Sequence, residues 1–162
     1  MIRKATTQDI QAICRLLEQV LAVHHSIRPD LFRAQGKKYD EKALQEMLAG
    51  QGSPIFVYDD DGVVTGYIMC QVYDQCGPAL LPVKTLYIDD LCVDKEARGK
   101  GLGRTLFGYV KDYAKENGFY NVTLHVWNGN HGAMMFYESL GLKPQFTNLE
   151  LIVGASPSAS MS

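Results

Sequence analysis

One short segment, rich in glycine and basic residues, carries the clearest chemical signal in this chain. It reads Arg98-Gly99-Lys100-Gly101-Leu102-Gly103 and is followed directly by Arg104. Three glycines let the backbone turn tightly, so that successive N–H groups can point at one spot. Such a spot binds an anionic oxygen, and the positive end of a helix dipole strengthens it. The spacing differs from the dinucleotide fingerprint and from the P-loop, and a glycine-rich turn alone is often only a turn.

The elements around this segment are those that a phosphate site needs. The apolar and β-branched run Thr85–Val93 predicts a strand that leads into the segment. From Leu102 onward, apolar residues recur on one helical face until Asn117-Gly118, a typical helix stop. A strand followed by a tight turn and a helix places the glycines at the helix N-terminus.

The rest of the chain predicts a mixed α/β fold. The apolar patterns give the order β-α-α-β-β-β-α-β-α-β, with early antiparallel hairpins and late crossovers. The other predicted strands are Ile2–Ala5, Ile55–Tyr58, Thr65–Tyr73, Asn121–Val126 and Leu149–Val153. The other predicted helices follow a cap at Thr6 or Thr7, run from about Asp40 to Leu48, and run from Asn130 to Leu140. We expect a twisted mixed sheet flanked by helices.

Composition limits the domain count and the partners. The chain has 162 residues and a net charge of −2, and its pI is about 6.1. We expect a single domain over residues 1–153 and a disordered tail over 154–162. The charge argues against a protein that holds nucleic acid by bulk electrostatics. No apolar run is long enough for a membrane span or a signal peptide, so a cytoplasmic location is expected.

Two motifs together resemble a known enzyme family. The first is Arg98-x-x-Gly101-x-Gly103, and the second is Asn130-x-x-Ala133-x-x-Phe136-Tyr137-Glu138-x-Leu140-Gly141. At this separation they resemble the GNAT superfamily of acyl-CoA-dependent N-acetyltransferases, and the element order matches from about Ile2 to Val153. The resemblance implies the GNAT fold, acetyl-CoA as co-substrate, and an acyltransferase that acetylates a primary amine by direct attack in a ternary complex.

The resemblance also implies which residues contact the coenzyme. The strand that ends at Val93 would splay from its neighbour, and the pantetheine would bond the backbone there. Tyr137 would protonate the departing sulfur, although it could merely pack beside the coenzyme. Asn130 would bond the coenzyme, cap its own helix, or do both. The implied cofactor-binding set is Leu91, Cys92, Val93, Arg98, Gly99, Lys100, Gly101, Leu102, Gly103, Arg104, Asn130 and Tyr137.

The general base is not evident from the sequence. Many family members carry a glutamate where this chain has Thr85, which cannot take a proton. Asp89 and Asp90 lie further along the same predicted strand, and they are the alternatives for the base or for binding the substrate's ammonium. Strand alternation predicts that they face opposite sides, with Asp89 on the side of Thr85 unless a bulge intervenes. Either carboxylate could instead bond a neighbouring loop.

The acceptor amine is also open. His24, His25 and Tyr39 lie where related enzymes place acceptor-binding residues, although two histidines in a turn are commonly just surface residues. We expect no metal site. A small-molecule acceptor is the first hypothesis; the alternatives are acetylation of a protein N-terminus or lysine, and a non-catalytic acyl-CoA-binding module. A homodimer is compatible with the resemblance, since many relatives pair through sheet edges.

Overall fold

The computed structural model describes residues 1–157. Within them, the strands are β1 (Ile2–Lys4), β2 (Ile55–Asp60), β3 (Val63–Gly77), β4 (Leu80–Val93) and β5 (Asn121–Leu124). The helices are α1 (Ile10–Ile27), α2 (Glu41–Ala49), α3 (Leu102–Glu116) and α4 (His131–Ser139), with 3-10 turns η1 (Thr7–Asp9) and η2 (Lys95–Ala97). The expected disordered tail, 154–162, lies in part outside the described residues.

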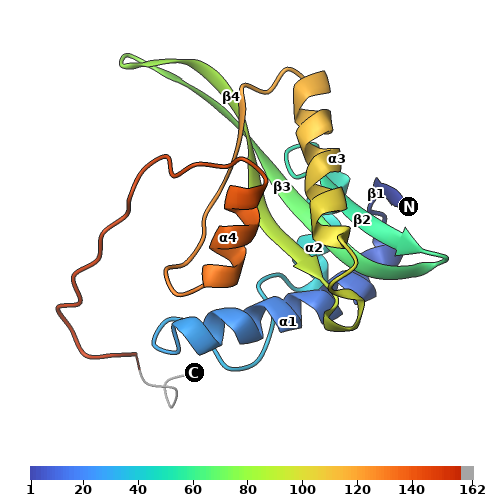
Figure 1. Cartoon of the computed structure of the whole chain (residues 1–162), viewed down its shortest axis with the longest axis horizontal. Coiled ribbons are helices and arrows are strands. Elements are labelled where there is room, and N and C mark those ends of the chain that lie inside the picture. The colour runs from blue at the N-terminus through green and yellow to red at the C-terminus, as the bar shows by residue number, and fades with distance from the viewer. Residues whose placement is uncertain (158–162) are drawn as a thin grey trace.

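The strands form one mixed sheet in the order β1-β2-β3-β4-β5. Neighbouring strands are antiparallel except β4 and β5, which are parallel and are joined through α3. Helices α1 and α2 pack on one face of the sheet, and α3 and α4 pack on the other (Figure 1). This is the expected α/β architecture of a twisted mixed sheet flanked by helices.

The sequence explains how α1 begins and why it packs on the sheet. The Thr6 backbone N–H donates to the Asp9 carboxylate at 2.7 Å, closing the turn that begins α1. Arg3 of β1 binds the same carboxylate through two nitrogens, at 2.8 and 2.9 Å. Buried apolar side chains at Ile13, Leu16 and Leu17 then hold α1 against the sheet.

The hairpins are longer than the sequence predicts. The β2–β3 turn is made by Asp61 and Gly62, both with positive φ (51° and 90°), as a two-residue hairpin loop requires. The next hairpin, β3–β4, projects beyond the body of the sheet (Figure 1). Only Thr85–Ile88 of β4 pairs with β5, so both ends of this long strand extend past it.

The predicted last strand is wrong for this chain as described. Residues 149–153 form no strand, and Leu149, Leu151 and Val153 are 88%, 84% and 90% exposed. The alternating apolar pattern shows only that the segment can pair, because a strand also needs a neighbour that offers free backbone groups. Among residues 1–157, no strand pairs with this segment. The strand at Asn121 is also shorter than predicted and ends at Leu124.

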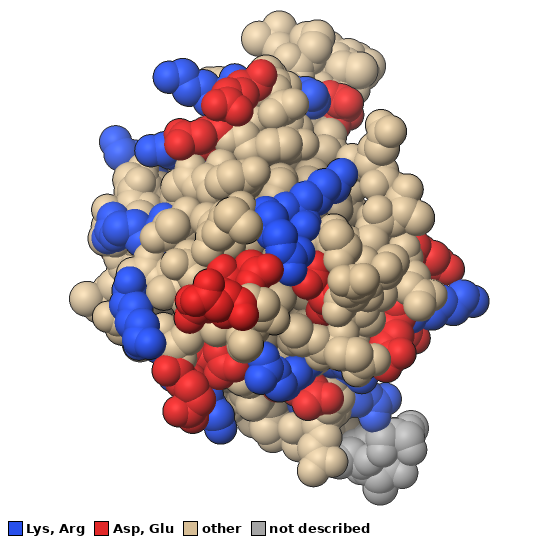
Figure 2. Space-filling model, turned by 90° about the vertical axis from the view of Figure 1, so that its right-hand side faces the viewer, with Lys and Arg blue, Asp and Glu red and all other residues tan. Residues whose placement is uncertain are grey.

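The surface carries mixed charge. Acidic and basic side chains are interspersed over the face in Figure 2, as expected from a net charge of −2. Among the described residues, we find no helix with the length and apolar character to cross a membrane.

Candidate active site

The glycine-rich segment forms the turn between β4 and α3. Gly99 and Gly101 have φ values of 82° and 79°, in the left-handed region that side chains other than glycine adopt at a cost. Gly101 is the residue before α3, so the turn delivers the chain directly into the helix N-terminus. The segment therefore has the geometry predicted for an anion cradle.

The backbone of this turn has free hydrogen-bonding capacity. Among the described residues, the N–H groups of residues 99–104 donate to no acceptor of the chain. A helix leaves its first N–H groups unbonded, and the turn adds those of its glycines. The side chains of Arg98, Lys100 and Arg104 are exposed around it, and Arg104 also binds the Ser139 hydroxyl of α4 at 3.1 Å.

The end of β4 next to this turn has an open edge. Pairing with β5 stops at Ile88 and Leu124, so residues 89–93 of β4 have no partner on that side among the described residues. The splay expected between these two strands is therefore present. The Cys92 side chain points toward α1, where its thiol donates to the Leu16 carbonyl at 3.6 Å.

Helix α4 brings Tyr137 to the same region. A side chain added at Gly103 of α3 would lie 3.2 Å from the Phe136 ring, so glycine there allows α3 and α4 to pack closely. The Tyr137 ring packs between Phe136 and Phe107, with centroids 5.1 and 6.5 Å away. Burial raises the pKa of Tyr137, and the negative charge of Asp90 raises it further. Its phenol is thus a neutral donor within electrostatic range of Asp90.

The two aspartates lie on the same side of the sheet, contrary to the prediction from alternation. Met69 of β3 pairs with Asp90 and Cys70 pairs with Ile88, so Asp89 is the extra residue of a β-bulge. Asp89 accepts a hydrogen bond from the Tyr39 hydroxyl, and Asp90 accepts one from the Tyr67 hydroxyl, both at 2.7 Å. Both tyrosines belong to the layer of α1 and α2. The bulge thus brings two carboxylates together.

The environments of these carboxylates differ. The Asp89 side chain is 7% exposed and fully engaged, because Lys38 also forms an ion pair with it at 2.9 Å. Burial raises the pKa of Asp90 to about 6, although hydrogen bonding from Tyr67 and the charge of Lys38 oppose the shift. Asp90 therefore changes charge close to neutral pH, where a proton acceptor for an amine has to operate.

The comparisons with known proteins agree with this geometry. The model of the Acetyltransferase (GNAT) family matches residues 20–142. This chain belongs to the GNAT acetyltransferase family. It is 31% identical over 141 residues to the uncharacterized N-acetyltransferase YhfO of Bacillus subtilis, covering 86% of this chain and 87% of that protein. The resemblance inferred from the two motifs is confirmed.

Solved structures of other proteins share this fold. A mutant form of the BH1408 protein from Bacillus halodurans matches with a TM-score of 0.90 and 33% identity, over 94% of this chain and 99% of that one. The aminoglycoside acetyltransferase meta-AAC0020, from a soil metagenomic sample, matches with a TM-score of 0.70 and 20% identity, over 95% of this chain and 96% of that one. At that identity the likeness concerns the fold alone.

GNAT acetyltransferases use acetyl-CoA as co-substrate, and this chain offers groups that fit it. Free N–H groups at a helix N-terminus suit phosphate oxygens, and the open backbone edge of β4 suits an extended amide-containing arm. Asn130 is the N-cap of α4, since its side-chain oxygen accepts from the Ala133 N–H at 3.2 Å. This confirms the capping alternative for Asn130 and leaves its contact with the coenzyme a prediction.

A hollow of about 650 Å³ borders Asp89 on the α1 and α2 side of β3, β4 and β5. Its lining is largely aromatic and amide-bearing: Gln71, Tyr73, Gln75, Val83, Thr85, Tyr87, Asp89, Asn121, Thr123, Leu124, His125, Gln145 and Phe146. Thr85 is buried and donates to the Asn121 side chain at 2.6 Å, which ties β4 to β5. The residue that replaces the family glutamate is therefore a structural link at the wall of this hollow.

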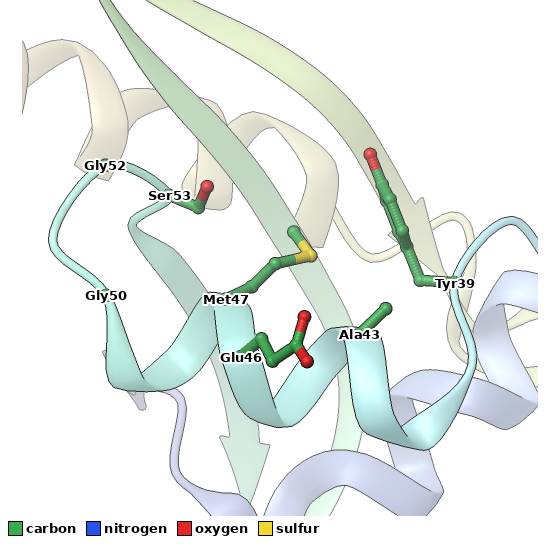
Figure 3. Close-up of a pocket in the computed structure, with 7 residues that line it drawn as sticks. All are labelled: Tyr39, Ala43, Glu46, Met47, Gly50, Gly52 and Ser53. Carbon is green, nitrogen blue, oxygen red and sulfur yellow. The ribbon is translucent and has the colours of Figure 1, made fainter.

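A second hollow, of about 360 Å³, lies beside α2 (Figure 3). It is lined by Tyr39, Ala43, Glu46, Met47, Gly50, Gly52 and Ser53. The Tyr39 ring stands between α2 and β4 in the close-up, and its hydroxyl binds Asp89 of the larger hollow. Tyr39 thus lines the smaller hollow and holds the carboxylate that borders the larger one.

The structure brings one of the three predicted acceptor-binding residues to the carboxylates. Tyr39 binds Asp89, whereas the histidines contact Phe32. The His25 ring nitrogen Nδ1 lies 2.8 Å from the Phe32 carbonyl oxygen, and the His24 ring packs on the Phe32 ring at 5.1 Å. Phe32 in turn meets Trp127 edge-on at 5.4 Å. The histidines therefore fasten the segment between α1 and α2.

Sequence reasoning missed Lys38, Tyr67 and most of the hollow. Tyr67 lies inside an apolar strand, so the sequence pattern indicates only a core residue. It is fully buried, and its hydroxyl donates to Asp90. Lys38 precedes Tyr39 in an irregular segment with no periodic pattern. Neither position could be linked to Asp89 or Asp90 without the bulge and the tertiary contacts.

Proposed function

We propose that this enzyme transfers the acetyl group of acetyl-CoA to a primary amine of a small polar molecule, by direct attack in a ternary complex. One observation carries the proposal. The open edge of β4, a bulge with two carboxylates, and the neutral phenol of Tyr137 all meet at one end of one strand. These are the groups that acyl transfer to an amine needs.

The coenzyme would be held mainly by backbone. The N–H groups of residues 99–104 would bind its pyrophosphate, with charge support from Arg98, Lys100 and Arg104. The backbone of Leu91, Cys92 and Val93 would bind the pantetheine arm, and one of these N–H groups would polarise the acetyl carbonyl. When bound, acetyl-CoA supplies the acetyl group as an activated thioester.

The two aspartates would have different roles toward the amine. Asp89 would bind the incoming ammonium in the position that Lys38 occupies, because both are cations of the same kind. An alkylammonium has a pKa of about 10, so it must lose a proton before it can attack. Asp90, with a pKa of about 6, is ionised at pH 7 and would accept that proton, directly or through one water.

Tyr137 would complete the proton balance. The departing sulfur gains a proton, and a buried phenol that remains neutral can supply it. Its position on α4 beside the open strand edge supports this role. The phenolate left behind would then recover a proton from solvent.

The hollow supports the choice of a small acceptor. Its volume of about 650 Å³ lies within the range of small-molecule sites, roughly 300–1,000 Å³. The amide groups of Gln71, Gln75 and Gln145 suit a polar, hydroxyl-bearing amine, and Asp89 gives its cation a partner. A cytoplasmic location also stays a prediction.

The test is release of free coenzyme A from acetyl-CoA across polyamines, aminoglycosides, amino acids and short peptides. The Gly101→Glu variant, which should block the phosphate turn, is the negative control. We expect turnover with one class of small amine. Turnover with peptides alone would favour a protein N-terminus or lysine as acceptor. Tight binding of acetyl-CoA with no turnover on any amine would favour a non-catalytic binding module.

A further inference from the structure

Lys38 places a primary amine beside the carboxylates of the candidate site. Its Nζ atom lies 2.9 Å from a carboxylate oxygen of Asp89 and 5.4 Å from the centre of the Tyr39 ring. Among residues 1–157, it is the only lysine that forms an ion pair. The chain therefore carries, within its own site, the kind of group that the site is proposed to acetylate.

The backbone at Lys38 is held in place while its side chain stays accessible. Tyr39 follows directly, and its hydroxyl donates to Asp89 at 2.7 Å, which fastens this segment to β4. Earlier in the same segment, Phe32 packs edge-on against Trp127 at 5.4 Å. The Lys38 side chain itself is 49% exposed, so its ammonium can turn away from Asp89 without displacing any core residue.

The groups that could move protons lie within electrostatic range of this amine. Burial raises the pKa of Asp90 to about 6, and the positive charge of Lys38 opposes that shift. Burial also raises the pKa of Tyr137, and the negative charge of Asp90 adds to that rise. One carboxylate thus senses both the amine and the phenol. An amine that is part of the chain also needs no binding step, which favours its reaction over that of a free amine.

We propose that Lys38 is itself an acetyl acceptor, so that the enzyme acetylates its own Lys38 when acetyl-CoA is bound and no external amine competes. This inference rests on the proposed function. Lys38 gives a proton to Asp90, its nitrogen bonds to the acetyl carbonyl carbon, and the bond from that carbon to sulfur breaks. Tyr137 supplies the proton that the departing sulfur takes up. The products are N-acetylated Lys38 and free coenzyme A, and the neutral amide no longer forms an ion pair with Asp89.

The first test incubates the protein with acetyl-CoA alone and follows acetylation of each lysine by peptide mass spectrometry. We expect Lys38 to be acetylated at least about 100-fold faster than its neighbour Lys37 and the exposed Lys42, because positioned proton transfer contributes at least that factor. Lys38→Arg should remove most of the acetyl groups that the intact protein gains, whereas the matched control Lys42→Arg should remove few. Equal rates at the three lysines would overturn the proposal.

A coenzyme-binding variant separates enzymatic from spontaneous acetylation. In Gly101→Glu, Lys38 should be acetylated no faster than Lys42. If circular dichroism shows that this variant does not fold, Asp90→Asn at pH 8 takes its place, with the same expectation. Unchanged acetylation of Lys38 in a folded variant would mean that the site does not catalyse the step.

A mixing experiment tests whether each chain modifies itself. The parent protein is incubated with acetyl-CoA and a tagged Gly101→Glu chain, whose own turn should not bind the coenzyme. We expect Lys38 of the parent to be acetylated and Lys38 of the tagged chain to stay unmodified. Equal modification of both would show transfer between molecules and would overturn the proposal.

Release of coenzyme A with added amines distinguishes this inference from the proposed function. Turnover of an added amine, with Lys38 unmodified in acetyl-CoA alone, would refute self-acetylation and leave the proposed function standing. Acetylated Lys38 with no turnover of any added amine would support self-acetylation and refute the small-molecule acceptor. Absence of both reactions would refute both.

Discussion

The two halves of the candidate site use different chemical groups, backbone N–H groups in one and side chains in the other. On the proposed coenzyme side, the groups are the free backbone N–H groups of residues 99–104, presented by a turn whose shape depends on Gly99 and Gly101. On the proposed acceptor side, the groups are side chains: Asp89 and Asp90 of β4 are reached by Lys38 and Tyr39 from the segment between α1 and α2, and by Tyr67 from β3. One half is local in the sequence, and the other exists only after the chain has folded.

This difference predicts how each half responds to change. A backbone site has no single side chain to delete, so it fails when a substitution fills or distorts the turn. A side-chain site can be altered one group at a time, and each alteration should shift a separate kinetic parameter. The variants below use this contrast, from the largest expected effect to the smallest.

Gly101→Glu should have the largest effect. The substitution forces a side chain into the left-handed backbone region and places an anion where a phosphate would bind. We expect kcat/KM to fall by at least about 100-fold, since each loss of about 1.4 kcal/mol in binding is a factor of ten. Calorimetry should show that acetyl-CoA binding is lost.

Gly62→Glu is the matched control for that variant. Gly62 also has a positive φ (90°) and open space around it, but it lies in the β2–β3 turn. It should carry the same backbone strain and keep coenzyme affinity. If both variants bind acetyl-CoA equally well, the glycine turn is not the phosphate site.

Asp90→Asn should separate activity from stability. We expect kcat/KM of the parent to rise with pH through an apparent pKa near 6, and the variant to lose about 100-fold in activity at pH 8. Because the pKa of Asp90 is raised on folding, the folded chain holds a proton between about pH 4 and pH 6 that the unfolded chain has released. Stability therefore falls as pH rises across that window, and the neutral variant should be more stable than the parent at pH 8.

The two readouts for this variant are the pH profile of kcat/KM and the thermal unfolding temperature at pH 4 and pH 8. Asp112→Asn, on the exposed face of α3, is the control and should change neither. A variant at Asp90 that is stabilised at pH 8 but fully active would remove this carboxylate from the mechanism.

Tyr137→Phe should reduce kcat by about 10- to 100-fold and leave the affinity for acetyl-CoA nearly unchanged. Loss of the phenol removes a proton donor, whereas the ring still packs between Phe136 and Phe107. Tyr109→Phe, an exposed tyrosine of α3, is the control. Unchanged kcat in the Tyr137 variant would mean that this side chain only packs beside the coenzyme.

The same contrast explains what could be predicted from sequence. The glycines, the preceding strand and the following helix are consecutive, so the tight turn at the start of α3 could be predicted from the sequence, and the family resemblance implied the β4–β5 splay. The positions of Asp89 and Asp90 were predicted too, but not their common face, because a bulge of one residue inverts strand parity and leaves no mark in a single sequence. Lys38 and Tyr67 meet these carboxylates only through tertiary packing.

The predicted strand at Leu149–Val153 shows another limit of prediction from sequence, because a suitable pattern did not become a strand. Its apolar pattern was identified correctly, yet the described chain gives it no neighbour. An alternating apolar pattern shows that a segment can pair as a strand, but it does not show whether the folded chain places that segment beside a free strand edge.

Lys38→Ala should have the smallest effect, on the acceptor side alone. Lys38 forms an ion pair with Asp89 at 2.9 Å, so an incoming ammonium has to displace it. Because such a partly exposed pair contributes about 1 kcal/mol or less, we expect the KM for the amine to fall by two- to fivefold while kcat and the KM for acetyl-CoA stay unchanged. Lys42→Ala, an exposed lysine of α2, controls for the loss of one positive charge. Initial rates over a range of both substrates would measure this. A higher KM for the amine would instead mean that Lys38 helps to hold the acceptor, and that Asp89 serves Lys38 rather than the substrate.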